Sequence, residues 1–190
     1  MSSLVLIPWP ETAWSAEDRI CGRSPVPLTE AGRAQAQSWG QALDTAGVTF
    51  VYSGPEQAAV ETARAIAGQC RVKSKALEDL AEVDVGLWDG LAEEALKRSS
   101  PKAHKTWRED PASICPPEGE DLKEAQDRLR EELARLSKKH GDRTIAVVLG
   151  PLAFAITRCI VESNHLGNIR SLKSDEPVRY TAAGKAARAE

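Results

Sequence analysis

The sequence lacks long apolar runs and concentrated positive charge. No apolar run approaches the roughly 18 residues that indicate a membrane span, and no basic segment leads into an apolar one as in a secretory signal. The net charge is -3, and lysine and arginine are scattered among the acids, so no basic stripe can neutralise a nucleic-acid backbone. We therefore expect a cytoplasmic protein that binds neither membranes nor nucleic acids.

Clustered metal ligands are also missing. The four cysteines, Cys21, Cys70, Cys115 and Cys159, lie far apart, without a Cys-x-x-Cys motif or the Cys/His spacing of a zinc site. This pattern favours free, mostly buried thiols over disulfides or zinc. We expect no metal and no cofactor.

The chain contains enough apolar residues to form one hydrophobic core. Its 190 residues are 42% hydrophobic and 28% charged, which suits one substantial domain and not two. We expect a single domain over residues 1–183 and a flexible C-terminal tail over residues 184–190.

Strand-like runs alternate with helical segments along the chain, which predicts a three-layer α/β/α sandwich around a mostly parallel sheet. The apolar runs Leu4–Ile7, Thr49–Tyr52 and Thr144–Leu149 are the expected adjacent central strands. The carboxyl ends of such strands border the ligand crevices of these sheets. We therefore expect Trp9 and Gly150 to lie close together, with Gly54 beside them.

Several helix ends carry sequence signals. Thr29 is suited to the N-cap of the first helix and Gly47 to its end, whereas Pro55 suits the first turn of the second helix and Gly68 its stop. Near the C-terminus, the segment EPVRYTA predicts an edge strand.

A series of short motifs follows these elements in order. They are ETAW (11–14), GR (22–23), PLTEAG (27–32), YSGP (52–55), VETARAIA (60–67), LAEVDVGLWDG (80–90), WREDP (107–111) and PPEGE (116–120). Together they resemble the histidine phosphatase superfamily, the phosphoglycerate mutase-like proteins. None of the motifs is specific alone, but their order over most of the chain is.

The resemblance also shows what this chain has lost. Active members use a first histidine as nucleophile, two arginines and a second histidine to hold the phosphoryl oxygens, and an acid for the leaving-group proton. The first arginine, the nucleophile, the second arginine and the second histidine fall at Pro8, Trp9, Ala58 and Gly150, respectively. Of the functional residues, only Glu82 at the acid position and Arg23 in the substrate-bordering loop remain.

These losses remove what phosphoryl transfer requires, namely a nucleophile and positive charge around the phosphoryl oxygens. Pro8, Pro10 and Pro151 also lack backbone N–H groups that could bind phosphate. The segment Pro8–Pro10 is therefore predicted to plug a phosphate pocket. We expect a catalytically inactive protein with a binding or regulatory role toward an unidentified protein or small molecule, and the sequence is compatible with a homo-oligomer.

A phosphoester hydrolase with a rebuilt site is the alternative. It would use Glu82 and Arg23 with Ser53 or Ser15, and Arg23 and Ser53 are then the candidate substrate-binding residues. If Glu82 and Arg23 have only structural roles, we expect Glu82 to be a partly exposed acid that is hydrogen-bonded to the backbone. We then expect Arg23 to be a salt-bridging surface residue.

The remaining motif residues have structural interpretations. Glu11 and Thr12 are expected to brace the first loop, and Trp14 and Trp88 to pack against their neighbours. The histidines His104, His140 and His165 lie in or beside polar segments and not after buried strands, so none is expected to replace the nucleophile.

Overall fold

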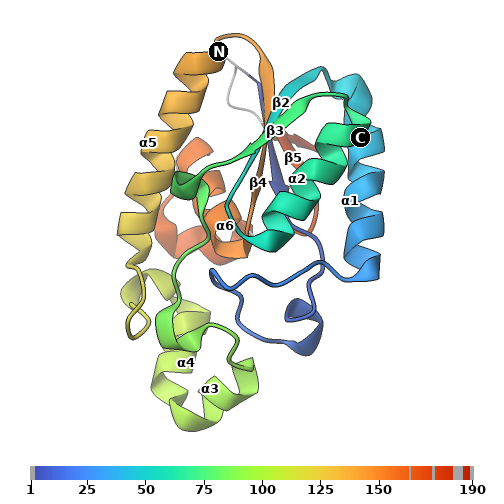
Figure 1. The fold of residues 1–190 in the computed structure, drawn as a ribbon. Coiled ribbons are helices and arrows are strands. Elements are labelled where there is room, and N and C mark those ends of the chain that lie inside the picture. The colour runs from blue at the N-terminus through green and yellow to red at the C-terminus, as the bar shows by residue number, and fades with distance from the viewer. Residues whose placement is uncertain (1–2, 163, 173, 182–185, 189–190) are drawn as a thin grey trace.

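The computed structural model describes residues 3–162, 164–172, 174–181 and 186–188. A six-stranded sheet with the order β3-β2-β4-β1-β5-β6 forms its centre (Figure 1). The strands are β1 (Leu4–Pro8), β2 (Val48–Ser53), β3 (Lys73–Ala76), β4 (Thr144–Leu149), β5 (Val178–Tyr180) and β6 (Ala186–Arg188). The first four strands in the sheet order are parallel, and β5 and β6 are antiparallel to their neighbours. The mostly parallel sheet with β1, β4 and β2 adjacent confirms the prediction.

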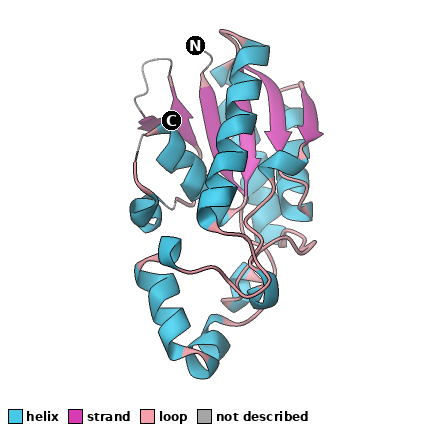
Figure 2. Ribbon diagram, turned by 90° about the vertical axis from the view of Figure 1, so that its left-hand side faces the viewer, coloured by secondary structure: helices cyan, strands magenta, loops and turns pink. Residues whose placement is uncertain are grey.

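Helices cover both faces of this sheet. The helices are α1 (Glu30–Leu43), α2 (Gln57–Gln69), α3 (Glu93–Ser99), α4 (Pro101–Glu109), α5 (Leu122–His140) and α6 (Pro151–Val161). Helices α1 and α2 pack on one face and α5 and α6 on the other, which confirms the three layers (Figure 1). In Figure 2, which is viewed from the α5 side, this long helix crosses in front of the strands. Helices α3 and α4 lie beyond the lower end of the sheet in Figure 1. No helix in the described ranges is both long and apolar enough to cross a membrane.

Side chains of the central strands alternate between two cores. Leu6 and Val147 belong to the cluster that contains α5 and α6, whereas Val5, Ile7 and Ala146 belong to the cluster that contains α1 and α2. Since successive residues of a strand point to opposite faces, both faces must be apolar. This explains the unbroken apolar runs in the sequence.

The expected helix ends are partly correct. Thr29 caps α1, because its hydroxyl accepts a hydrogen bond from Gly32 N at 3.0 Å. Helix α1 itself ends at Leu43, and Gly47, in a left-handed conformation with φ 69°, ends the 3-10 turn over Asp44–Ala46 that follows it. The expectation that Pro55 lies in the first turn of α2 was wrong, because α2 begins only at Gln57 and Glu56 is its N-cap residue, with an extended backbone. Gly68 lies in the last turn of α2, which ends one residue later.

The C-terminal segment differs from the expectation. β5 pairs with β1 on one side and with β6 on the other, so the expected edge strand is internal to the sheet. Ala186–Arg188, which the expectation placed in a flexible tail, form β6 by pairing with the N–H and C=O groups on the free side of β5. The rest of that expected tail and its boundary at residue 183 lie outside the described residues.

The four cysteines are free, but only Cys159 is buried. Cys21 and Cys70 are partly exposed, and Cys115 is exposed in the loop before α5. The expectation of mostly buried thiols was therefore wrong. Its basis was the average burial of cysteine, which does not apply to a loop outside the core.

The loop after β1 is held tightly against α1. The carbonyl oxygen of Glu11 accepts a hydrogen bond from Thr29 N at 3.0 Å, and its carboxylate accepts one from the Thr29 hydroxyl at 2.7 Å. A Cβ atom at Gly32 would collide with the Glu11 carbonyl oxygen, so this contact requires a glycine. The prediction that Glu11 braces the first loop is confirmed.

Replacing this glycine should therefore destabilise the fold. Gly32→Ala is expected to lower the free energy of unfolding by about 1–3 kcal/mol, because backbone atoms cannot move aside as a flexible side chain could. The matched control is Gly68→Ala, since no atom lies within 4 Å of the added Cβ. It should be neutral or stabilising by about 0.4–1 kcal/mol. Urea unfolding of both variants checks this, and equal effects would contradict the proposed contact.

Candidate functional site

The candidate site lies where β1, β2 and β4 end. Trp9 N donates a hydrogen bond to the Leu149 carbonyl at 2.9 Å, and Gly54 N donates one to the Val148 carbonyl at 3.1 Å. A Cβ atom at Gly150 would lie 2.7 Å from Cη2 of the Trp9 indole. The expectation that these residues gather at one edge of the sheet is confirmed.

The indole of Trp9 fills most of the space at the carboxyl ends of these three strands. Its side chain is only 8% exposed, and the cavity that remains beside it has a volume of about 10 Å³. This volume is about that of one water probe and too small for a phosphate group. The lining residues are Trp9, Thr12, Trp14, Cys21, Gly22, Ser24, Val26, Glu56 and Ala58.

A carboxylate takes up the anion-binding end of α6. Glu82 accepts hydrogen bonds from the first free amides of this helix, Leu152 N at 2.9 Å and Ala153 N at 2.8 Å, and from Val83 N at 2.5 Å. Helix N-termini favour anions because their N–H groups are unpaired and their dipole is positive. Here an internal side chain already fills that role.

Two expectations about this region are corrected. Glu82 is not partly exposed, because its exposure is 0%, although its bonding to the backbone was predicted. Pro151 does not strip the loop of donors either, because the two residues that follow it keep amides that point to Glu82. The start of α6 therefore keeps its backbone N–H donors, but Glu82 already accepts their hydrogen bonds.

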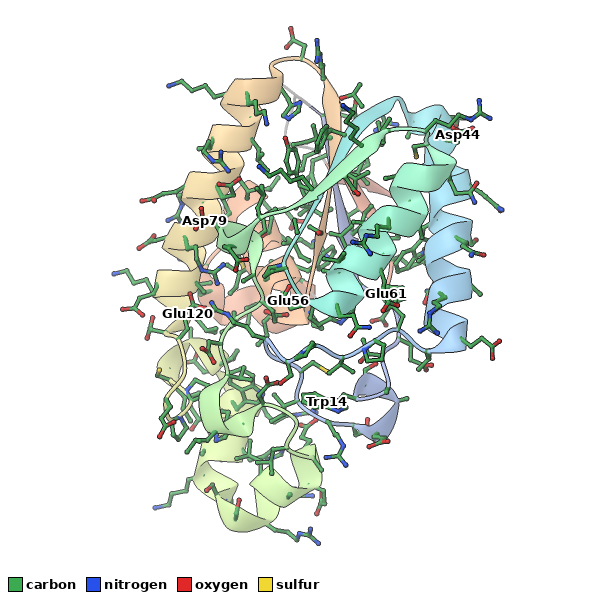
Figure 3. All side chains as sticks on the ribbon, viewed as in Figure 1. Trp14, Asp44, Glu56, Glu61, Asp79 and Glu120 are labelled. Atoms are coloured by element: carbon green, nitrogen blue, oxygen red, sulfur yellow. The ribbon has the colours of Figure 1, made fainter. Side chains whose placement is uncertain are left out.

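A second buried acid, which the sequence reasoning missed, lies beside Glu82. The Glu56 carboxylate accepts a hydrogen bond from Glu82 N at 2.7 Å, and the Glu56 side chain is 4% exposed. Among the described residues, its Oε2 atom has no hydrogen-bond partner. Figure 3 shows Glu56 at the lower end of the sheet, above the loop that carries Trp14. Nothing in the sequence indicates its burial, because an acid after Pro55 fits the first turn of a helix, where negative charge is favoured.

The two acids make the site unfavourable for phosphate. Burial raises the pKa of Glu82 to about 8, since loss of hydration and the nearby Glu56 outweigh the hydrogen bonds from the amides. Burial also raises the pKa of Glu56. No cationic side chain lines the small cavity in the described structure. The same part of the chain holds no group of three or more histidine, cysteine or acidic residues that could bind a metal.

Arg23 does not supply the missing charge. Its Nε atom donates to the Glu82 carbonyl at 2.8 Å, and its Nη2 atom forms a salt bridge with Glu120 at 3.0 Å. Glu120 also pairs with Arg128 at 2.9 Å. Arg23 therefore forms salt bridges, as expected for a structural role, and it is not among the residues that line the cavity.

The candidate serines have structural surroundings. Ser53 is 1% exposed at the end of β2 and does not line the cavity, which in the described structure leaves it out of reach of a ligand there. The Ser15 hydroxyl donates to the Thr12 carbonyl at 3.1 Å and accepts from Thr12 N at 2.8 Å. This pair braces the first loop, as expected for Thr12.

The aromatic residues mainly pack. Trp88 and Trp107 form an edge-to-face pair with centroids 5.4 Å apart. Trp14 lies against Gly90, where an added Cβ would come within 2.7 Å of its ring, and it also borders the small cavity.

The histidines bond elsewhere. His104 contacts Glu93, His140 contacts the Tyr52 hydroxyl, and the carbonyl of His165 accepts from Cys159. None of these described histidines lines the cavity at Trp9.

The raised pKa of Glu82 predicts a pH-dependent stability. Because the folded-state pKa of about 8 exceeds the ordinary value of 4.5, the folded protein binds the extra proton between these values. The contribution of Glu82 protonation to the free energy of unfolding is complete below pH 4.5 and is lost as the pH rises through about 8. Between these values the free energy of unfolding falls by up to about 1.4 kcal/mol per pH unit. Urea unfolding across this range should show the decline.

Glu82→Gln should flatten that decline, because the substituted side chain cannot ionise. Glu94→Gln, at an exposed glutamate on α3, is the matched control and should keep the wild-type slope. A wild-type unfolding free energy that stays level or rises over this range would show that the three amides keep Glu82 ionised.

Known proteins share both the sequence pattern and the fold. The family model described as histidine phosphatase superfamily (branch 1) matches residues 4–182. Phosphoglycerate mutase-like protein 4 of Arabidopsis thaliana is 33% identical over 153 residues, which cover 78% of this chain and 66% of that protein. Phosphoserine phosphatase 1 of Hydrogenobacter thermophilus is 28% identical over 148 residues, or 78% of this chain and 70% of that protein.

The solved structures agree in fold. Bacillus stearothermophilus YhfR has a TM-score of 0.90 at 23% identity and covers 99% of this chain and 95% of its own. A mycobacterial glucosyl-3-phosphoglycerate phosphatase in complex with VO3 has a TM-score of 0.87 at 22% identity, with 95% and 91% covered. The architecture, the order of the motifs and the match over residues 4–182 lead to one conclusion: the chain belongs to the histidine phosphatase superfamily.

Proposed function

We propose that this chain is a catalytically inactive member of its superfamily and that its fold serves a binding or regulatory role. The observation that carries the proposal is the occupied anion site, in which Glu82 accepts the α6 amides. Trp9 fills the adjoining space. An external phosphate would have to displace both the buried Glu82 carboxyl group and a buried indole.

The absence of a nucleophile supports the same proposal. Covalent phosphoryl transfer needs a group that attacks phosphorus, and the position that corresponds to the family's nucleophile holds an indole, which cannot do so. The charge environment adds to this, because the arginine positions of the family are Pro8 and Ala58. Transition-state stabilisation by guanidinium groups is thereby lost.

The alternative hydrolase gains no support from the geometry. It requires Glu82 and Arg23 to meet a substrate, but Glu82 is fully buried and the Arg23 guanidinium is held by Glu120 and the Glu82 carbonyl. The relatives named as a phosphatase and a mutase-like protein suggest enzymatic activity in the family. Extending such activity to this chain would need an open phosphate pocket.

The first test of the proposal is turnover. Purified protein should hydrolyse phosphoserine and other phosphomonoesters only at background rate and should form no phosphohistidine with a reactive phosphoryl donor, because the nucleophile is missing. Isothermal calorimetry should detect no vanadate binding. Turnover that copurifies with the protein and disappears in Glu82→Ala would favour the alternative hydrolase.

The second test restores the lost groups. A six-fold variant replaces the degenerate positions and their proline neighbours: Pro8→Arg, Trp9→His, Pro10→Gly, Ala58→Arg, Gly150→His and Pro151→Gly. It should regain vanadate binding before any hydrolysis, since clamps and nucleophile act as a unit. The Gly150→His side chain should also shift the Glu82 carboxylate away from the α6 amides, because a Cβ atom there collides with it. Some stability should be lost, on the order of a few kcal/mol for a large buried aromatic.

The single variant Trp9→His is the control for this restoration. It should not bind vanadate, because its imidazole would lack guanidinium partners and would still lie beside Glu82. Circular dichroism establishes that both variants are folded. Vanadate binding by the single variant as tight as by the six-fold one would show that the phosphate pocket was never dismantled.

A further inference from the structure

A second cavity, of about 230 Å³, lies beside the filled pocket. It shares Cys21 with the small cavity and reaches the first residues of α6, Pro151 and Leu152. Pockets for drug-sized ligands measure about 300–1,000 Å³, so this one suits a smaller metabolite. The space beside Trp9 is therefore open, although the Trp9 side chain fills the position proposed for phosphate.

Backbone pairing fixes the walls of this cleft. Ile20 N donates to the Leu91 carbonyl at 2.9 Å, and Gly90 N donates back to the Ile20 carbonyl at 2.9 Å. Glu93 N donates to the Asp18 carbonyl at 3.0 Å. We call this backbone pairing between residues 18–20 and 90–93 the loop ladder. Because it joins the first loop to the start of α3, the cleft is preformed.

Two guanidinium groups line the cleft with donors to spare. Arg108 forms a salt bridge with Glu93 at 2.9 Å through Nη1, and Arg19 uses Nε for Glu17 and Nη1 for the Gly90 carbonyl. A guanidinium carries five N–H donors, so each arginine keeps donors for a ligand. Burial raises the pKa of Glu93, but hydrogen bonds from His104 and Arg108 outweigh it and lower the pKa below its usual value. Glu93 therefore remains a charged anchor for Arg108.

One acid in the lining stays unpaired. The carboxylate of Asp18 has no hydrogen-bond or salt-bridge partner within the described part of the chain, and its backbone is left-handed with φ 52°. Non-glycine residues with positive φ are uncommon and often lie at functional sites. Asp18 and Glu93 balance Arg19 and Arg108, so the charged side chains of the lining sum to zero.

The rest of the wall is apolar. Ile20, Trp107 and Leu152 line the same cavity. Trp107 is held edge-on by Trp88, which gives the cleft a rigid aromatic side. A ligand that fits this lining needs a cation, an anion and an apolar body.

We propose that this cleft binds a zwitterionic amino acid with an apolar side chain. Its carboxylate accepts from Arg108 and Arg19, its ammonium group pairs with Asp18, and its side chain packs against Trp107 and Leu152. A phosphate ester suits the cleft less, because a dianion would meet the unpaired Asp18 and find both arginines shared with glutamates. The inference rests on the proposed function, since it gives a ligand to the part of the site that the plug leaves open.

Three probes separate the charge requirements by isothermal calorimetry. L-phenylalanine carries both charges, 3-phenylpropionate only the carboxylate, and phenethylamine only the ammonium group. L-phenylalanine should bind at least about tenfold more tightly than either analogue, because each charged hydrogen bond adds affinity.

Variants assign those charges to residues. Asp18→Asn keeps a residue that tolerates positive φ and should reduce the affinity for L-phenylalanine about tenfold, to the level of 3-phenylpropionate. Arg108→Gln should reduce it to the level of phenethylamine. Arg33→Gln, on α1 and outside the lining of this cleft, is the matched control and should leave it unchanged.

Failure of this inference is distinguishable from failure of the proposed function. Absence of L-phenylalanine binding, equal affinity for the three probes, or an unchanged affinity in Asp18→Asn would overturn the amino-acid site. Phenyl phosphate is included as a fourth probe with release of inorganic phosphate as readout. Its hydrolysis would overturn the inactive-enzyme proposal, whichever amino acid binds.

Discussion

The arrangement of the site depends on the hydrogen bonds between the Glu82 carboxylate and the amides at the start of α6. This one interaction joins segments that are 70 and 71 residues apart in the sequence. The backbone of Glu82 extends it in two directions, because its N–H donates to Glu56 and its carbonyl accepts from Arg23. The loop after β3, the helix starts of α2 and α6 and the first loop are thus ordered around an internal carboxyl group.

Burying that carboxyl group has a free-energy cost that the surroundings must offset. A buried carboxyl group loses its hydration, and in the folded state this favours the protonated form. Three amide donors and the helix dipole act in the opposite direction. The adjoining Trp9 contributes by removing apolar surface from water, which typically stabilises by about 2–3 kcal/mol for a large side chain. Packing of Trp9 and hydrogen bonding of Glu82 therefore both stabilise this end of the sheet.

Much of the fold was predictable because it rests on local patterns. Apolar runs identified β1, β2 and β4, and Thr29 marked the start of α1 through a capping bond within one turn. The closeness of Trp9 and Gly150 followed from the rule that parallel strands end at one edge of the sheet.

The errors arose where long-range packing decides. Whether Glu82 is exposed depends on α6, far along the chain, and the burial of Glu56 depends on the loop that folds over it. Likewise, β6 has only three residues and becomes a strand only through the free side of β5. Short polar or mixed segments carry too weak a period to reveal such partners.

The loop ladder has a consequence for how the protein acquires its structure. Arg19 and Gly90 are separated by 71 residues, and the whole of α1, β2, α2 and β3 lies between them. Contacts of such separation require closure of a long loop and form late compared with local helices. During synthesis, residues 18–20 of the first loop therefore cannot pair with residues 90–93 until that later segment has left the ribosome, and the cleft is assembled only then.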